Sequence, residues 1–392
     1  MSARPSEGSR TSLAELAALF LRLGTIAFGG PAAHIAMMED EVVRRRQWLT
    51  REQFLDYLGA TNLIPGPNST EMAIHIGHAR AGWPGLLVAG AAFILPAALM
   101  VGALAWSYVR FGALPEVSAI LYGIKPVVIA VVIQALWSLG RSAVKSYGLA
   151  ALGLVAMTAA ALGVHELAVL AAAGAAGALV VRRPVAGRGM WRSSALAATA
   201  GALPVSTPAI AAGAVAGGAA ASLGALFATF AKIGAVLFGS GYVLLAFLRA
   251  DFVERLGWLT ETQLLDAVAV GQVTPGPVFT TATFVGYVVA GWPGAVVATV
   301  GIFLPAFVFV ALSGPLVPRI RKSPAAGAAL DGVIVASLAL MAVVTWQLGR
   351  AALVDAGTVI LAVAALILLV GFRLNSVWLV AGGGLTGLIL GS

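Results

Sequence analysis

The chain has 392 residues, of which 60% are hydrophobic and only 10% are charged, and its mean hydropathy is +0.97. Because a soluble globular protein carries about 25% charged residues, this composition excludes a fold whose whole surface faces water. A net charge of +8 would suit nucleic acid in a soluble protein, but here we assign the basic residues to helix ends at a membrane surface and expect no nucleic-acid partner.

Apolar runs long enough to cross about 30 Å of hydrocarbon recur along the chain. A membrane-spanning segment is either a helix or part of a closed barrel, and barrel strands alternate apolar and polar residues, which these runs do not. The sequence therefore predicts an all-α polytopic membrane protein with about ten to thirteen transmembrane segments. The chain has no cysteine, so a thiolate metal site and thiol redox chemistry are excluded, and we expect no cofactor.

Motifs of the first part of the chain return in the second part, first at an offset of 210 residues and then at 209. The repeated motifs are Phe-Gly-Gly/Ser at 28–30 and 238–240, Trp-Leu-Thr at 48–50 and 258–260, Pro-Gly-Pro at 65–67 and 275–277, and Gly-Trp-Pro-Gly at 82–85 and 291–294. Ordered matches of this extent indicate an internal repeat. We predict a first half at 1–182, a basic linker with an apolar segment at 183–221, and a second half at 222–392.

In chain order, the first half predicts a helix at about 12–30, then a polar loop that ends at the N-cap residue Thr50. A helix from about 51 runs into Pro-Gly-Pro and continues to about 79. Apolar helices follow near 84–108, 117–140, 147–163 and 165–181. The second half repeats this order after its own N-cap, Thr260. The apolar stretch at 194–220 is either an extra span or a surface segment.

Equivalent loops of the two halves differ in charge. The loop before the first Pro-Gly-Pro carries four arginines between 44 and 51, whereas its counterpart carries two arginines and three acids between 249 and 261. The loop near 319–322 is basic, and its first-half counterpart, which has Arg110 beside Glu116, is not. Because positive loops favour the cytoplasmic side, this exchange predicts halves of opposite orientation, the inverted repeat of a secondary transporter.

Each Pro-Gly-Pro lies inside an apolar segment and breaks its helix, because proline removes a backbone donor and clashes with the preceding turn. Broken backbone at membrane depth requires protein or a cavity to satisfy it, and the half-helix that follows offers free amides to an anion. The alternative is a structural kink with capping residues. The candidate substrate-binding residues at the two breaks are Asn62, Pro65, Gly66, Pro67, Asn68, Ser69, Thr70, Gln272, Pro275, Gly276, Pro277, Thr280 and Thr281.

Cations inside apolar runs are further candidates, because charged groups are costly in lipid. Arg22 and Lys232 are equivalent positions, and a duplicated cation facing the bundle interior suits a divalent anion; the alternative is a side chain that snorkels to the interface. Lys125 has Ile334 as its counterpart, so any role it has is asymmetric. Turn residues complete the candidate substrate-binding set: Gly29, Gly30, Gly239 and Ser240.

Acidic and imidazole side chains suggest proton coupling or a gate. Glu71 and His75 are four residues apart on the half-helix after the first break, so they share a face and are placed to relay protons. His34 and Glu41 follow the Phe-Gly-Gly turn, and Asp251 aligns with Glu41. A metal site is disfavoured because no third ligand is evident. No nucleophile triad or phosphate-cradling loop appears, so we do not expect an enzyme.

Together these motifs resemble the chromate ion transporter family in its long-chain, two-domain form. The resemblance covers nearly the whole chain outside 183–220 and rests on Phe28-Gly29-Gly30-Pro31 with His34, Glu41-Val42, Trp48-Leu49, Pro65-Gly66-Pro67, Gly77, Gly82, Phe93-x-x-Pro96 and their second-half partners. It implies proton-driven export of chromate from the bacterial cytoplasm across the inner membrane by two halves of opposite orientation.

Two departures from the family pattern concern the cargo. The family often has glutamine before Pro-Gly-Pro, and this chain keeps it as Gln272 but has Asn62 in the first half. Glu71 adds an acid to the expected site, so sulfate or another tetrahedral oxyanion remains an alternative to chromate. The expected partners are this anion, protons and the lipid bilayer, with a homodimer as an open alternative.

Two further functions remain open at this stage. One is a transporter or channel for a different solute, such as a cation bound by Glu71, His75 and Glu41. The other is a membrane scaffold or membrane enzyme, against which the duplicated broken helices argue, because they have no evident purpose in a scaffold.

Overall fold

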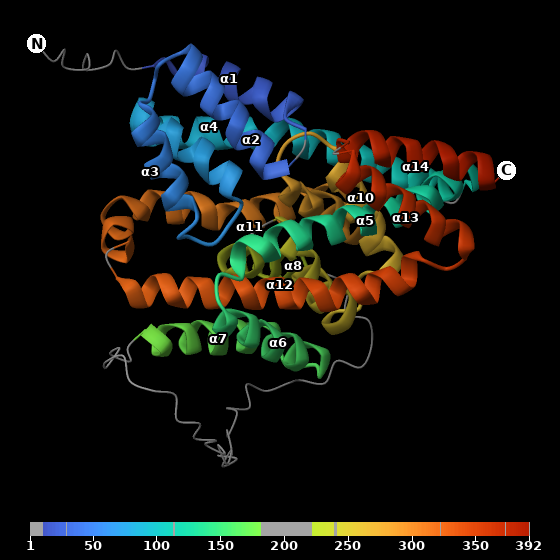
Figure 1. Ribbon diagram of the computed structural model, residues 1–392. Coiled ribbons are helices and arrows are strands. Elements are labelled where there is room, and N and C mark those ends of the chain that lie inside the picture. The colour runs from blue at the N-terminus through green and yellow to red at the C-terminus, as the bar shows by residue number, and fades with distance from the viewer. Residues whose placement is uncertain are drawn as a thin grey trace, which may run out of the picture.

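The computed structural model describes residues 11–28, 30–112, 114–181, 222–238, 241–321, 323–372 and 374–391. Within these ranges the chain is helical and has no β-strand (Figure 1). The helices long and apolar enough to cross a membrane are Asn68–Phe111, Pro115–Ala143, Val278–Ser313 and Pro324–Ala352, and five shorter apolar helices accompany them. The all-α membrane fold is confirmed. The number of crossings stays a prediction, because the stretch 194–220 lies outside the described residues.

The elements of the two halves follow one another in the same order. The first half contains α1 (Leu13–Ile26), α2 (Gly30–Glu39), the π-helix η1 (Asp40–Arg45), α3 (Arg51–Thr61), α4 (Asn68–Phe111), α5 (Pro115–Ala143), α6 (Tyr147–Ala161) and α7 (Glu166–Val181). The second half contains α8 (Leu223–Val236), η2 (Gly241–Val243), α9 (Leu244–Leu248), the π-helix η3 (Arg249–Arg255), α10 (Glu261–Val273), η4 (Val278–Thr280), α11 (Thr281–Arg321), α12 (Pro324–Ala352), α13 (Ala356–Gly371) and α14 (Ser376–Gly391).

The polar loop predicted after the Phe-Gly-Gly turn is wrong, because α2 and η1 occupy most of it. Gly30 has φ of 77°, which lets the chain turn sharply and start a new helix. Met38 and Val42 on this segment are fully buried, so packing of an apolar face stabilises a helix that the surrounding charges conceal in the sequence.

Both predicted N-caps are confirmed. Thr50 accepts a hydrogen bond from the Gln53 amide at 3.2 Å, and Thr260 accepts one from the Gln263 amide at 3.1 Å. Each glutamine side chain in turn accepts from the amide of its capping threonine, which completes a capping box. The repeat therefore extends to the hydrogen bonds that begin α3 and α10.

The long helices α4 and α11 are each kinked at Gly-Trp-Pro-Gly, near the place where the sequence predicts a boundary between two helices. Gly82 and Gly291 both have φ of 63°, with ψ of −147° and −154°, a conformation essentially restricted to glycine. The helix segments on either side of each kink pack closely, since a Cβ on Gly77 would overlap with the backbone of Gly85. Each Pro-Gly-Pro is thus followed by a short half-helix that turns back into a long helix.

The last helices of each half pack on the other half. In Figure 1, α6 and α7 lie along α12, and α13 and α14 lie beside α5. A Cβ on Gly123 of α5 would overlap with Gly383 of α14, and a Cβ on Gly332 of α12 would overlap with Ala173 of α7. Small residues allow such close approach of helices in membranes. Because each half covers a long helix of the other with its last two helices, neither half alone has a complete core.

Candidate functional site

At each Pro-Gly-Pro break, the backbone donates a hydrogen bond to the other half, and we call this reciprocal pair of hydrogen bonds the crossing of the breaks. The amide of Gly66 donates to the carbonyl of Leu237 at 2.8 Å, and the amide of Gly276 donates to the carbonyl of Ala27 at 3.0 Å. Ala27 and Leu237 are the C-caps of the equivalent helices α1 and α8. Each broken backbone is therefore satisfied by the end of a helix from the other half, as broken backbone at membrane depth requires.

At the two crossing positions, Gly66 and Gly276, only glycine fits the backbone conformation and the available space. Gly66 has φ of 137° and Gly276 has φ of 91°, in the region that side chains rarely adopt. A Cβ on Gly276 would lie 2.7 Å from the Cβ of Ala97, and a Cβ on Gly66 would overlap with a carboxylate oxygen of Glu71. The predicted broken helices thus form a tightly packed interface between the halves.

A cavity opens at the start of α4. The amides of Asn68 and Ser69, in the first turn, have no acceptor inside their helix, as in the first turn of any helix. The side chain of Asn68 donates to Asn62 Oδ1 at 2.8 Å, and both asparagines line a cavity of about 530 Å³, which we call the asparagine cavity. Lys145 lies on the same cavity, with its Nζ 2.8 Å from Asp331.

His34 links the starts of the two breaks. Its Nε2 lies 3.0 Å from the carbonyl oxygen of Ala27, and its Nδ1 lies 3.2 Å from Ser69 Oγ. Because a carbonyl only accepts, we assign the proton of the neutral ring to Nε2, and Nδ1 then accepts from the Ser69 hydroxyl. The carbonyl of Ala27 also accepts from Gly276. The counterpart of His34 at an offset of 210 is Leu244, so this link exists in the first half alone.

Several buried polar atoms near the breaks have no hydrogen-bond partner among the described residues: Thr70 Oγ1, both carboxylate oxygens of Glu71, His75 Nε2 and Gln272 Nε2. The ring of His75 stacks on Tyr57 at a centroid distance of 5.3 Å. Each buried group without a partner is costly and calls for a functional explanation. The polar face predicted for Glu71 and His75 is present, although no hydrogen bond between the two is found.

The second break differs from the first. The 3₁₀ turn η4 replaces the first α-helical turn, and the hydroxyls of Thr280 and Thr281 donate to the carbonyls of Pro277 and Val278, both at 2.8 Å. These hydroxyl protons are occupied within their own turn. Donation from Thr280 and Thr281 to an oxyanion therefore stays a prediction that requires a rearranged turn.

The predicted cations Arg22 and Lys232 form a duplicated ion pair. Arg22 lies 3.4 Å from Glu41 Oε1, and Lys232 lies 2.6 Å from Asp251. The acids stand in the π-helices η1 and η3, and π-helical turns occur frequently at functional sites. Because each cation already has a carboxylate partner, substrate binding by Arg22 and Lys232 stays a prediction.

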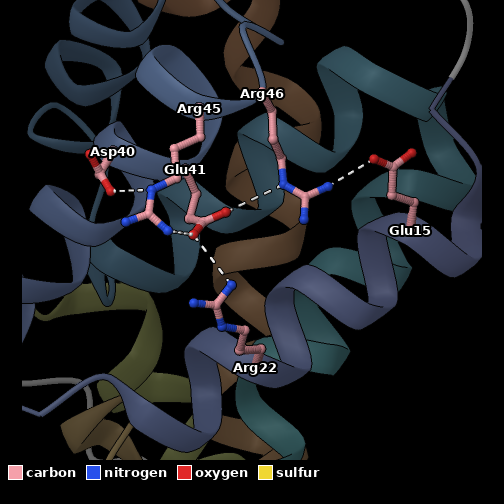
Figure 2. Close-up of polar contacts among 6 residues, drawn as sticks. All are labelled: Glu15, Arg22, Asp40, Glu41, Arg45 and Arg46. Carbon is pink, nitrogen blue, oxygen red and sulfur yellow. Dashed lines mark hydrogen bonds and ion pairs between the residues drawn. The ribbon is translucent and has the colours of Figure 1, made fainter.

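Around Glu41 the cations outnumber the acid. Its carboxylate accepts from Arg45 at 3.1 Å and from Arg46 at 3.4 Å as well as from Arg22, and Arg46 reaches on to Glu15 at 2.8 Å (Figure 2). The acid retained at this position holds α1 against η1. A gate role for Glu41 and Asp251 stays a prediction.

Lys125 is paired across the two halves. Its Nζ lies 3.1 Å from Asp266 Oδ1, and Tyr108 donates to Asp266 Oδ2 at 2.9 Å. The Asp266 side chain is 2% exposed. Sequence reasoning missed Asp266 and Tyr108 as site residues, although the repeated acid at Asp56 and Asp266 was a signal that could have found the former.

The remaining predicted residues lie at the turns. Gly30 begins α2, whereas Gly29, Gly239 and Ser240 lie outside the described residues. Pro65 and Pro275 immediately precede the crossing glycines Gly66 and Gly276. The structure therefore brings the candidates of the first break together around Asn68 and places the cations elsewhere.

Comparisons with known proteins agree on one family. The model of the chromate transporter family matches residues 14–178 and 224–388. A chromate transport protein of Cupriavidus metallidurans is 37% identical over 96% of this chain and 93% of its own length. A probable chromate transport protein of Synechococcus elongatus is 34% identical over 91% of this chain and 89% of its own. A chromate transport protein of Pseudomonas aeruginosa is 34% identical over 86% and 82%. No solved structure matches the chain.

Proposed function

Because the chain belongs to the chromate transporter family, we propose that it carries chromate, or a tetrahedral dianion of the same shape such as sulfate, across the membrane. The family is a transport family, so its role is transport rather than catalysis. The observation that supports this cargo is the crossing of the two breaks at Gly66 and Gly276, with a cavity at the start of α4.

The chemistry of this cavity suits an oxyanion. The free amides of the first turn of α4 and the positive end of its dipole stabilise negative charge. The asparagine side chains Asn62 and Asn68 add amide donors. Among the described residues that line the cavity, the one acid is Asp331, which is paired with Lys145. Ser69 stands one residue further along, hydrogen-bonded to His34.

Export of a dianion draws directly on the membrane potential. Each elementary charge gains about 2.3 kcal/mol per 100 mV, so a dianion leaving a negative interior gains about twice that. Glu71 adds sensitivity to protons, because its buried carboxyl stands in the first turn of α4 and its ionised form repels a bound dianion. In this proposal, protonation of Glu71 permits anion binding, and the membrane potential drives export.

The two halves have opposite orientations in the proposed arrangement. The reciprocal hydrogen bonds at Gly66 and Gly276 and the exchanged charges of equivalent loops support it. The arginine-rich loop between 44 and 51 then faces the cytoplasm of a bacterium, with the chain in its inner membrane.

Chromate accumulation in energised cells tests this function. Cells that express the chain should accumulate less chromate than cells without it, and an uncoupler should abolish the difference. The Asn68→Asp variant puts a carboxylate beside the anion and should accumulate chromate as empty cells do, whereas Asn68→Ser should keep export. Equal accumulation in expressing and empty cells would rule out chromate as the cargo and make sulfate the next anion to test.

A cation is the second candidate cargo, because the buried carboxylate of Glu71 has no partner among the described residues. The predicted co-ligand Glu41 is engaged by three arginines, which weighs against it. Flux that requires Glu71 but does not depend on the anion present would favour the cation.

A further inference from the structure

Two cavities occupy equivalent places in the repeat. The larger, of about 930 Å³, lies between α5 and the turn that joins α13 to α14, and the smaller, of about 510 Å³, lies between α12 and the turn that joins α6 to α7. We call them the Arg141 cavity and the Glu166 cavity, after a residue of each lining. Each is built from the long helix of one half and the helical turn of the other.

Residue correspondences show that the two cavities are related by the repeat. Ser138 and Gln347 line them at an offset of 209 residues. Ser376 and Glu166 line them at an offset of 210. In a transporter with inverted halves, positions related in this way open to opposite sides of the membrane.

The charges of the two cavities differ. Among the described residues that line the Arg141 cavity, the guanidinium of Arg141 is the single charge, and the other polar groups are neutral: Gln134, Ser138, Ser142, Asn375 and Ser376. No carboxylate of the described residues forms an ion pair with Arg141. A cation surrounded by amides and hydroxyls is the donor set that an oxyanion requires.

The Glu166 cavity carries carboxylates instead. Its acids are Glu166, Asp251 and Glu254. Its two arginines are already engaged, Arg255 with Asp251 at 2.8 Å and Arg249 with Glu254. An approaching dianion therefore meets carboxylates and cations in pairs rather than a free cation.

The Arg141 cavity also reaches the proposed transport site. Ser142 lines both this cavity and the asparagine cavity at the start of α4. The same end of α5 carries Lys145, whereas the equivalent end of α12 carries Arg350 with Asp355. The more basic end favours the cytoplasmic side.

We propose that the Arg141 cavity is the cytoplasmic vestibule in which a tetrahedral dianion binds before it reaches α4, and that the Glu166 cavity is the exit on the opposite side. Arg141, Gln134 and Asn375 hold the anion there. The paired carboxylates of the exit weaken rebinding and so favour outward flow. The identity of the anion rests on the proposed function, whereas the binding itself does not.

The absence of cysteine from the chain makes the sidedness directly measurable. Ser138→Cys and Gln347→Cys each introduce a single thiol into one cavity, to be labelled with a membrane-impermeant maleimide. The thiol of Ser138→Cys should react in inside-out vesicles and not in intact cells, and that of Gln347→Cys should show the reverse. Labelling of the Ser138→Cys thiol from outside intact cells would overturn the proposal.

Anion binding is measured with the same thiol. Sulfate is the probe because chromate oxidises thiols. Sulfate should slow labelling of Ser138→Cys at least about threefold relative to chloride at equal ionic strength, and Arg141→Gln should remove this protection. Arg350→Gln, the equivalent substitution at a residue that lines neither cavity, should keep it. Absence of protection, or protection that survives Arg141→Gln, would overturn the vestibule.

Transport measured separately distinguishes the two proposals. Protection of Ser138→Cys by sulfate without flux of sulfate or chromate would support the vestibule and reject the proposed function. Flux without protection would do the opposite.

Discussion

Among the site residues, Glu71 has the environment that calls most strongly for a functional explanation. Its side chain is fully buried, both carboxylate oxygens lack partners among the described residues, and it stands in the first turn of α4. Burial of a carboxyl group without hydrogen-bond partners costs free energy, so its presence calls for a functional explanation such as a change of protonation during transport. Sequence reasoning found Glu71 because an acid inside an apolar run is rare.

We expect Glu71→Gln to remove the pH dependence of transport. In the wild type, anion flux should rise as the pH on the loading side falls, because protonation removes the repulsion between Glu71 and the dianion. The variant is neutral at every pH and should show a flat profile. Glu116→Gln, at an exposed acid near the start of α5, is the matched control and should keep the wild-type slope. An unchanged slope in Glu71→Gln would exclude Glu71 as the proton-sensitive group.

Substitutions at Lys125 and Asp266 should have non-additive effects on the free energy of unfolding. Either Lys125→Met or Asp266→Asn leaves a buried charge without its partner, which typically costs about 3–5 kcal/mol, whereas the double variant should regain much of that. Thermal unfolding in detergent of the wild type, the two single variants and the double variant measures this coupling. Lys145→Met and Asp331→Asn, at a more exposed pair, should change stability by no more than about 1 kcal/mol. Additive losses at Lys125 and Asp266 would contradict the pairing.

At the scale of elements, periodic and capping signals located most helices. The capping threonines marked the starts of α3 and α10, and Pro-Gly-Pro marked the start of α4. Gly-Trp-Pro-Gly marked the kinks of α4 and α11. These positions depend on local backbone geometry. The helix α2 was missed, since its stability comes from burial of Met38 and Val42 against other elements. Such tertiary packing leaves little trace in the local sequence.

The second half lacks one residue of the first half, and the glycine contacts at the two kinks locate this deletion. The close approach of Gly77 to Gly85 repeats as Gly286 to Gly294, so the offset is already 209 residues at Gly77. The single residue missing from the second half is therefore lost earlier, in the first turns of the half-helix, where the turn η4 replaces α-helix. A repeat search alone places the loss only between the Pro-Gly-Pro and Gly-Trp-Pro-Gly motifs.

Restoring a regular helix at a break should impair transport more than membrane insertion. Pro67→Ala or Pro277→Ala removes the residue that holds the chain extended before the new helix, so the crossing at Gly66 or Gly276 should loosen. We expect at least about a tenfold loss of flux, corresponding to about 1.4 kcal/mol, at equal amounts of protein in the membrane. Pro115→Ala, at the exposed start of α5, should retain flux. Full flux in both variants would mean that the breaks are only structural kinks.

At the scale of the whole molecule, the duplication was evident from the sequence, but the interleaving of the halves was not. A repeat identifies equivalent helices without specifying their neighbours. The packing of α6 and α7 on α12, and of α13 and α14 on α5, depends on contacts between residues far apart in the sequence, such as Gly123 with Gly383. For the same reason, the Arg141 cavity, which both halves build, was not predicted.

Halves expressed as two chains, divided within 183–221, should assemble with each other. Each alone leaves uncovered the long helix that its partner packs against, so each should be degraded or aggregate. Gly123→Leu in the first half should prevent co-purification, because Gly123 has no space for a side chain. Gly140→Leu, where a Cβ would meet no heavy atom within 4 Å, should not. Stable accumulation of one half alone would contradict the reciprocal exchange.

The measurement that tests the central claim most directly is anion flux through the purified chain in liposomes, driven by an imposed membrane potential. We predict that chromate or sulfate moves toward the positive side, that Asn68→Asp raises the KM at least about tenfold, equivalent to about 1.4 kcal/mol, and that Asn68→Ser stays close to wild type. Equal KM values for Asn68→Asp and the wild type, with flux intact, would contradict binding of the anion at the start of α4.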